Sequence, residues 1–127
     1  MKRYRFGLRT LGFAAALLAS TAALAGFRTA QQVVIWDAGR MANGDLGYIH
    51  NQPDLTQYMG CYSYATAGGC YATDRTGLTR SCSTSDANQL AVIRSLKTDS
   101  YLLFYWDTSG QCMFIEVDNS SATAPKS

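Results

Sequence analysis

The chain has 127 residues with 47% hydrophobic and 16% charged side chains, and its 11 Lys and Arg outnumber its 9 Asp and Glu. Four of the 11 basic residues lie within the first 25 positions, which leaves 7 basic against 9 acidic residues, a net charge of −2, in the remainder. That remainder lacks the clustered positive surface that neutralises phosphates, so its composition argues against a nucleic-acid partner. About a hundred residues suffice for one modest hydrophobic core, and we expect a single domain over residues 26–118.

The first 25 residues have the organisation of a secretory signal peptide, with a basic start, an apolar run and the small-residue cleavage motif Ala23-Leu24-Ala25. The apolar run at 11–18 is shorter than the roughly 20 residues of a membrane span and is followed by Ser20-Thr21. Gly26 stands where a lipoprotein has cysteine. We therefore expect a cleaved signal of bacterial type. The mature chain is then periplasmic or extracellular and has no membrane span.

All four cysteines, Cys61, Cys70, Cys82 and Cys112, lie in the exported part of the chain. An even number of cysteines in an oxidising compartment favours complete pairing, and each disulfide stabilises a small domain by roughly 2–4 kcal/mol. A zinc site is disfavoured because no two cysteines have the C-x-x-C spacing and the single histidine, His50, is distant in sequence. We expect two disulfides, no metal and no cofactor.

Short strands and turns dominate the first half of the mature chain. Gln31–Asp37 is β-branched and aromatic, which predicts a first strand or an N-terminal arm. Arg40–Asp54 is rich in turn residues and includes a short predicted strand at Leu46–Ile49. A three-stranded meander follows, with glycine-containing turns between its strands: Gln57–Thr66, Cys70–Asp74 and Leu78–Ser83.

A helix and a hairpin complete the predicted domain. N-cap residues precede Ala87–Leu96, where apolar residues recur at helical spacing. Tyr101–Asp107 is apolar on both sides, as a buried central strand is, and a tight turn leads to Gln111–Asp118. Asn119–Ser127 is small and polar, which predicts a disordered tail. The expected fold is therefore α+β, an antiparallel sheet of five or six strands with one packed helix and two disulfides.

The register of the meander limits how the cysteines pair. A first turn at 66–69 leaves Cys61 out of reach of Cys70, while the second turn brings Cys70 opposite or next to Cys82. A first turn shifted to 65–66 instead places Cys61 opposite Cys70. Two connectivities follow: Cys70–Cys82 with Cys61–Cys112, which we favour, and Cys61–Cys70 with Cys82–Cys112.

Catalytic chemistry finds little support in the residues. A Ser-His-Asp hydrolase would have only His50 as its base, and no nucleophile elbow occurs. Carboxylate pairs suit glycoside hydrolysis, but each candidate stands in or beside a turn signal, where Asp commonly bonds to the backbone. These candidates are Asp37, Asp45, Asp54 and Asp74. A small secreted hydrolase that uses His50 or an Asp remains the alternative function.

The strands carry an unusual number of tyrosines. Alternation in the first meander strand places Tyr58, Tyr62 and Tyr64 on one face, with Tyr71 on the neighbouring strand. Tyrosine is favoured at recognition surfaces because it offers contact area at low entropy cost. We therefore expect a non-catalytic exported binding protein that contacts a protein or glycan through this face or through the loop rich in Gly, Asn and Asp at Arg40–Asp54. Its possible roles are an inhibitor, an immunity protein, or a component of the envelope or matrix.

Overall fold

The computed structural model describes residues 29–123, which contain seven strands and two helices. The strands are β1 (Val34–Trp36), β2 (Met41–Asp45), β3 (Tyr58–Ser63), β4 (Gly68–Thr73), β5 (Thr79–Thr84), β6 (Tyr101–Trp106) and β7 (Cys112–Asp118). The helices are α2 (Leu46–His50) and α3 (Ala87–Arg94). The expected signal peptide lies outside the described residues.

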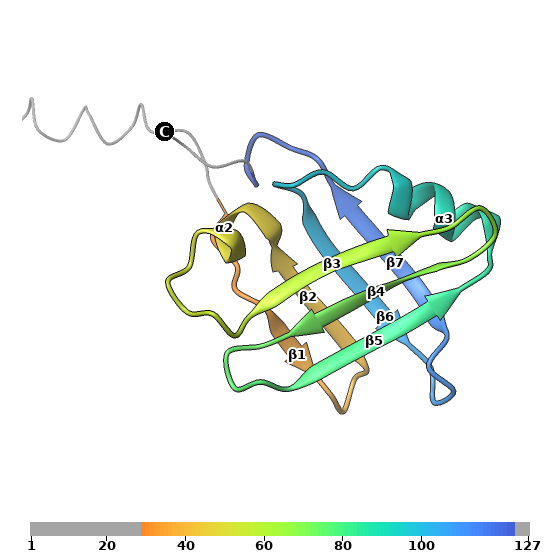
Figure 1. Cartoon of the computed structure of the whole chain (residues 1–127), viewed down its shortest axis with the longest axis horizontal. Coiled ribbons are helices and arrows are strands. Elements are labelled where there is room, and N and C mark those ends of the chain that lie inside the picture. Colours follow the sequence, from red (N-terminus) through yellow and green to blue (C-terminus); the bar gives the residue numbers. More distant parts are fainter. Residues whose placement is uncertain (1–28, 124–127) are drawn as a thin grey trace, which may run out of the picture.

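The strands form two antiparallel sheets, ordered β1-β2-β6-β7 and β3-β4-β5, and the three-stranded sheet lies over the four-stranded one (Figure 1). The α+β class is confirmed, with packed helices and two disulfides. The described strands number seven in two sheets, however, instead of five or six in one. The difference arises after β5, because the chain passes through α3 and enters β6, which pairs with β2 and β7. Among residues 29–123, the one β-bridge between the sheets is the isolated pair of Ser83 with Gln111.

The core lies between the two sheets. Ala42, Leu102 and Phe104 of the four-stranded sheet are fully buried, and so are Cys70 and Ala72 of the three-stranded sheet. Full burial of a side chain such as Phe104 stabilises the fold by roughly 1.5–3 kcal/mol. Because side chains alternate along a strand, the remaining positions of both sheets point outward and form two outer faces.

Helix α3 confirms the helix predicted behind the N-cap cluster. The Asp86 carboxylate accepts a hydrogen bond from the Gln89 backbone N–H at 2.9 Å, which satisfies one of the free donors of the first turn. Leu90 and Ile93 are buried on one side of the helix. The helix contacts β3, β4 and β7, so it covers one end of both sheets (Figure 1).

The short strand predicted at Leu46–Ile49 is wrong, because these residues begin helix α2. The Leu46 N–H donates to the Ser100 carbonyl oxygen at 2.9 Å, and the Asn51 side chain closes the turn by donating to the Gly47 carbonyl oxygen at 2.7 Å. Residues three apart share one side of a helix, so Leu46 and Ile49 both contact the core from a single turn. In so short a run, that spacing and strand alternation are difficult to separate.

The disulfides are Cys61–Cys70 and Cys82–Cys112, with Cα–Cα distances of 4.0 and 4.9 Å. The favoured pairing of Cys70 with Cys82 and of Cys61 with Cys112 is therefore wrong, and the alternative is confirmed. The ladder of β3 and β4 ends where Ser63 faces Gly68, so Cys61 lies directly opposite Cys70. Gly68 and Gly69 are part of β4 and not of the preceding turn.

The turn between β4 and β5 and the turn between β6 and β7 have the same arrangement of an Asp side chain and a glycine. Asp74 Oδ1 accepts a hydrogen bond from the Thr76 N–H at 2.9 Å, and Gly77 takes a φ of 89°. The turn between β6 and β7 repeats this geometry, since Asp107 Oδ1 accepts from the Ser109 N–H at 2.8 Å and the next residue is a glycine with φ 84°. The predicted turns at both positions are confirmed, with the positive φ that glycine adopts at low cost.

Strand β5 is fastened to the four-stranded sheet by side chains. Arg80 Nε and Nη2 donate to the two carboxylate oxygens of Asp37 at 2.7 and 2.9 Å, and these bonds hold the pKa of Asp37 below its usual 3.8. The Cys82–Cys112 disulfide joins β5 to β7. The open side of the three-stranded sheet is thereby held to the layer beneath it.

The structure differs from the predicted disordered tail at residues 119–123, which make specific contacts with the domain. The Asn119 side-chain amide donates to the Ser95 carbonyl oxygen at 2.9 Å, and the Thr29 N–H donates to the Ala122 carbonyl oxygen at 2.8 Å. Thr123 is 5% exposed. Small polar residues therefore continue the ordered domain past β7 through hydrogen bonds, which composition alone does not reveal.

Candidate functional site

The outward side of the three-stranded sheet brings together three of the four tyrosines singled out in the sequence. Pairing across β3, β4 and β5 arranges its nine outward positions in three rows. The rows are Tyr58–Thr73–Thr79, Gly60–Tyr71–Ser81 and Tyr62–Gly69–Ser83. Every one of these positions is Tyr, Gly, Ser or Thr. We call this surface, with the adjacent Tyr64, the tyrosine face.

Two glycines decide how the tyrosine rings lie. A methyl carbon on Gly60 would stand 2.9 Å from the hydroxyl oxygen of Tyr71, and one on Gly69 would stand 3.0 Å from that of Tyr62. Each ring therefore leans over the glycine of the neighbouring strand instead of standing upright from the sheet. One side of the ring covers backbone, and the sheet offers an aromatic surface of low relief.

Two ring pairs extend along β3. The ring centroids of Tyr58 and Tyr71 are 5.8 Å apart and those of Tyr62 and Tyr64 are 5.7 Å apart, with tilts of 53° and 62°. Such tilted pairs are favourable contacts between aromatic rings. Tyr58, Tyr62 and Tyr64 nevertheless keep 50%, 43% and 71% of their surface exposed. These rings are accessible to a partner.

The turn that holds Tyr64 is fixed from the side by α3. Arg94 Nη2 donates hydrogen bonds to the carbonyl oxygens of Tyr64 and Ala65, at 2.7 and 3.2 Å. A guanidinium that binds two successive carbonyl groups restricts the turn after β3. Arg94 thereby positions Tyr64 at the border of the tyrosine face.

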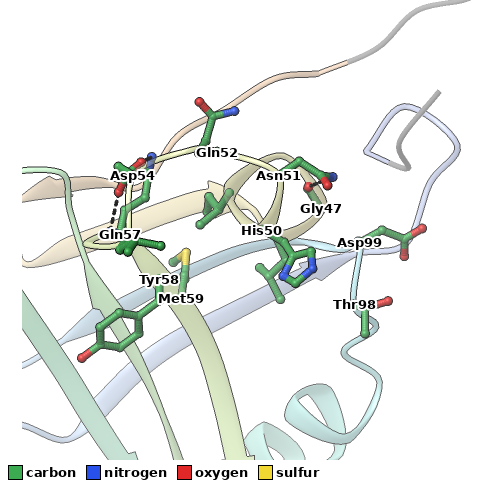
Figure 2. Close-up of a pocket in the computed structure, with 13 residues that line it drawn as sticks. Gly47, His50, Asn51, Gln52, Asp54, Gln57, Tyr58, Met59, Thr98 and Asp99 are labelled. Carbon is green, nitrogen blue, oxygen red and sulfur yellow. Dashed lines mark hydrogen bonds between the residues drawn. The ribbon is translucent and has the colours of Figure 1, made fainter. Parts of the chain in front are cut away.

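A pocket of about 780 Å³ adjoins the tyrosine face at Tyr58. Leu46, Ile49 and Met59 contribute apolar walls, and the polar rim comes from α2, the loop after it and the segment at 98–99. In Figure 2, Tyr58 and Met59 stand at one side and Thr98 and Asp99 at the other, with His50 between them. Tyr58 is thus shared by the tyrosine face and the pocket.

His50 lies in this pocket without a carboxylate partner. It is exposed at the end of α2, and no carboxylate oxygen lies within 4.0 Å of its ring among residues 29–123. Asp54, on the same rim, accepts hydrogen bonds from the backbone and side-chain N–H groups of Gln57 at 2.8 and 2.7 Å, and these bonds lower its pKa. Asp54 therefore shapes its loop, and the pair that would orient a histidine base is not assembled.

The remaining candidate carboxylates are dispersed. Asp37 pairs with Arg80, and Asp74 is engaged in the turn between β4 and β5. Asp45 is fully buried and accepts a hydrogen bond from the Gln31 N–H at 2.6 Å. In the described part of the chain, no cluster of three or more His, Cys, Asp or Glu has the arrangement of a metal site.

The outward side of the four-stranded sheet also exposes aromatic residues, and this face was not predicted from the sequence. Trp36, Met41, Tyr105 and Phe114 face one another in a single row across the four-stranded sheet, and we call this the apolar row. Trp36 and Phe114 are 57% and 50% exposed, and the rings of Tyr105 and Phe114 are 6.1 Å apart. The signal was present in Tyr101–Asp107, whose two apolar sides imply a cover on each.

Comparisons of the chain with protein-family models, with curated proteins and with solved structures give no match. Among the described residues, neither helix has the length and apolar character needed to cross a bilayer.

Proposed function

We propose that the protein is an exported, non-catalytic binding protein that contacts its partner through the tyrosine face. The observation that carries the proposal is the placement of Tyr71 and Tyr62 over Gly60 and Gly69, which spreads aromatic surface across outward positions that carry no charged side chain. The partner is a protein or glycan in the envelope or outside the cell.

The composition of the tyrosine face supports recognition. Tyr, Ser and Gly are enriched in the binding loops of antibodies, since tyrosine supplies contact area with few rotatable bonds and serine supplies adaptable hydrogen bonds. Exposed rings such as Tyr62 and Tyr64 would lose much of their accessible surface when a partner covers them. Each Å² of apolar area that is buried contributes about 25 cal/mol of favourable free energy.

Export is part of the proposal. Residues 1–25 are proposed to be a cleaved signal peptide of bacterial type, which places the mature chain in the periplasm or outside the cell. The disulfides Cys61–Cys70 and Cys82–Cys112 are compatible with such an oxidising compartment. Mass spectrometry of the protein recovered from cells tests cleavage, and a mature chain that begins at Gly26 is the expected result.

Binding is proposed over hydrolysis because of His50. A histidine that acts as a general base is normally oriented by a third group, as the Asp of a catalytic triad orients its imidazole. His50 has no carboxylate in that position within the described residues. If hydrolytic activity toward any substrate is found and His50→Ala abolishes it, the proposal is wrong.

Affinity capture tests the proposed surface. Oxidised mature protein is immobilised and exposed to extract of the native envelope, in parallel with Tyr62→Ala and with Phe114→Ala, which truncates an equally exposed ring on the opposite face. The wild-type protein and Phe114→Ala should retain the same partner, and Tyr62→Ala should retain much less. Equal retention by all three proteins would contradict the assignment of the tyrosine face.

A further inference from the structure

We infer that the ligand of the tyrosine face is a neutral carbohydrate chain, an inference that rests on the proposed function and specifies its partner. Three features of the face support this ligand: rings that lean over glycines, hydroxyl groups without a protein partner, and the absence of charge on the nine outward positions of β3, β4 and β5.

The rings suit the C–H faces of sugars. An aromatic ring carries negative charge on its faces, and the axial C–H groups of a pyranose present weakly positive hydrogens to such a face. Tyr62 and Tyr71 lean over Gly69 and Gly60, so their open sides turn away from the sheet. Tyr58 to Tyr62 spans four residues of β3, about 13 Å, which is room for more than one sugar ring.

Hydroxyl groups surround the rings and are free to bind. Within residues 29–123, the side-chain hydroxyls of Tyr58, Tyr62, Tyr71, Ser81 and Ser83 make no hydrogen bond to the protein, and both serines are exposed. A hydroxyl donates one hydrogen bond and accepts two, which matches the hydroxyl groups of a sugar. Each of the last two rows thus offers one ring and one serine to the ligand.

The absence of charged side chains on the face favours a neutral glycan over an anionic one. None of the nine outward positions is Asp, Glu, Lys or Arg, whereas Arg80 is engaged with Asp37. An anionic glycan needs cationic donors such as arginine or lysine, and these are missing from the nine positions. A longer neutral chain continues past Tyr58 toward the pocket.

An NMR titration tests the inference directly. Backbone ¹H–¹⁵N spectra of the oxidised mature protein are recorded with cellohexaose, maltohexaose or hexa-N-acetylchitohexaose, and with hexagalacturonate as an anionic control. At least one neutral hexasaccharide should shift the resonances of Gly60, Gly69 and Ser81, and hexagalacturonate should not. Tyr62→Ala should weaken binding about tenfold, Tyr62→Phe less, and Phe114→Ala not at all. No shift with any of the three neutral sugars would overturn the inference.

Envelope capture distinguishes this inference from the proposed function. The extract is treated either with periodate, which cleaves sugars at vicinal diols, or with proteinase K. A glycan ligand is lost after periodate and survives proteinase K. The opposite pattern, still dependent on Tyr62, overturns the glycan and keeps the binding function. If Tyr62→Ala changes retention in neither treated nor untreated extract, both proposals are wrong.

Discussion

The two outer faces of the molecule expose aromatic side chains to a similar degree and differ in everything around them. On the tyrosine face, rings lean over glycines and their neighbours are serine and threonine. On the other face, the apolar row ends at Phe114 on β7, which also carries the exposed acidic residues Glu116 and Asp118. The quantity of exposed aromatic surface therefore does not distinguish the two faces. Glycine placement and charge distinguish them, and these two features support the proposed sugar binding.

The faces also differ in what supports them. The tyrosine face is laid over the Cys61–Cys70 disulfide, which joins β3 to β4, and Cys82–Cys112 ties β5 to the layer below. In the apolar row, Trp36 packs on its own turn, since a methyl carbon on Gly39 would stand 2.2 Å from Trp36 Cε3. The tyrosine face thus has a disulfide between two of its own strands beneath it, whereas Trp36 of the apolar row is held by packing within its own turn.

The largest expected effect comes from removing the link between the sheets. Cys82 and Cys112 are separated by 30 residues, so replacing both with Ala should lower the free energy of unfolding by about 4 kcal/mol through the entropy of the unfolded chain. Replacing Cys61 and Cys70, separated by 9 residues, should cost about 3 kcal/mol. Guanidinium unfolding measures both. A larger loss from the Cys61–Cys70 pair would contradict the entropic account.

The next largest effect is expected from substituting the glycines that lie under the tyrosine rings. Gly69→Ala would bring a methyl carbon to 2.2 Å from the Cys82 carbonyl oxygen, so backbone must move, and we expect a loss of about 1–3 kcal/mol. Gly60→Ala meets only the end of the Tyr71 side chain and should cost less than about 1 kcal/mol while weakening ligand binding. Thermal unfolding and the sugar titration measure the two effects. Equal stability losses would argue against the described packing of Gly69.

We expect alanine substitutions at the glycines of the two hairpin turns to destabilise the protein equally. Gly77 and Gly110 have positive φ and open space around them, so Ala at either position is strained only through the backbone. Each substitution should lower the free energy of unfolding by about 1–2 kcal/mol, and by the same amount. Urea unfolding of the two variants checks this. A clear difference between them would show that the turns are not equivalent.

The smallest effect is a shared dependence on acid. Hydrogen bonds from Thr76 and from Ser109 lower the pKa values of Asp74 and Asp107 from the usual 3.8. A lowered folded-state pKa stabilises the fold fully above 3.8, and the stabilisation is lost as the pH falls through the folded-state pKa. Unfolding at a series of acidic pH values should therefore show falling stability below 3.8. Asp74→Asn should flatten the fall, and an unchanged profile would contradict the role of Asp74.

Local patterns in the sequence predicted the strands of the meander, the helix after Asp86 and the two Asp-Gly turns, since each depends on neighbours in the chain. They failed at positions where glycine can belong either to a turn or to a tightly packed strand. Gly68 and Gly69 are typical of a turn, whereas both lie in β4. A side chain at Gly68 would meet Leu90, and one at Gly69 would meet the Cys82 carbonyl oxygen, contacts between residues that are distant in sequence. Placing both glycines in the turn shifts the predicted register and with it the disulfide pairing.

Two further features, the positions of the tyrosine rings and the apolar row, depend on pairing between strands that are distant in sequence. The four tyrosines were found from alternation, but their positions over Gly60 and Gly69 depend on the pairing of β3 with β4. The apolar row was missed because it takes residues from β1, β2, β6 and β7, and only their register aligns Trp36 with Phe114. The two apolar sides of Tyr101–Asp107 indicate a second covered or aromatic face, but they do not indicate which residues of the other strands join it.

The most direct test of the central claim compares the two faces in one binding assay. Affinity for the captured envelope ligand is measured for the wild type, for Tyr62→Ala with Tyr71→Ala, and for Trp36→Ala with Phe114→Ala, after circular dichroism establishes that each protein is folded. Loss of at least about tenfold in the tyrosine variant, with the other variant unchanged, is the predicted result. Loss confined to the Trp36 and Phe114 variant would contradict the account.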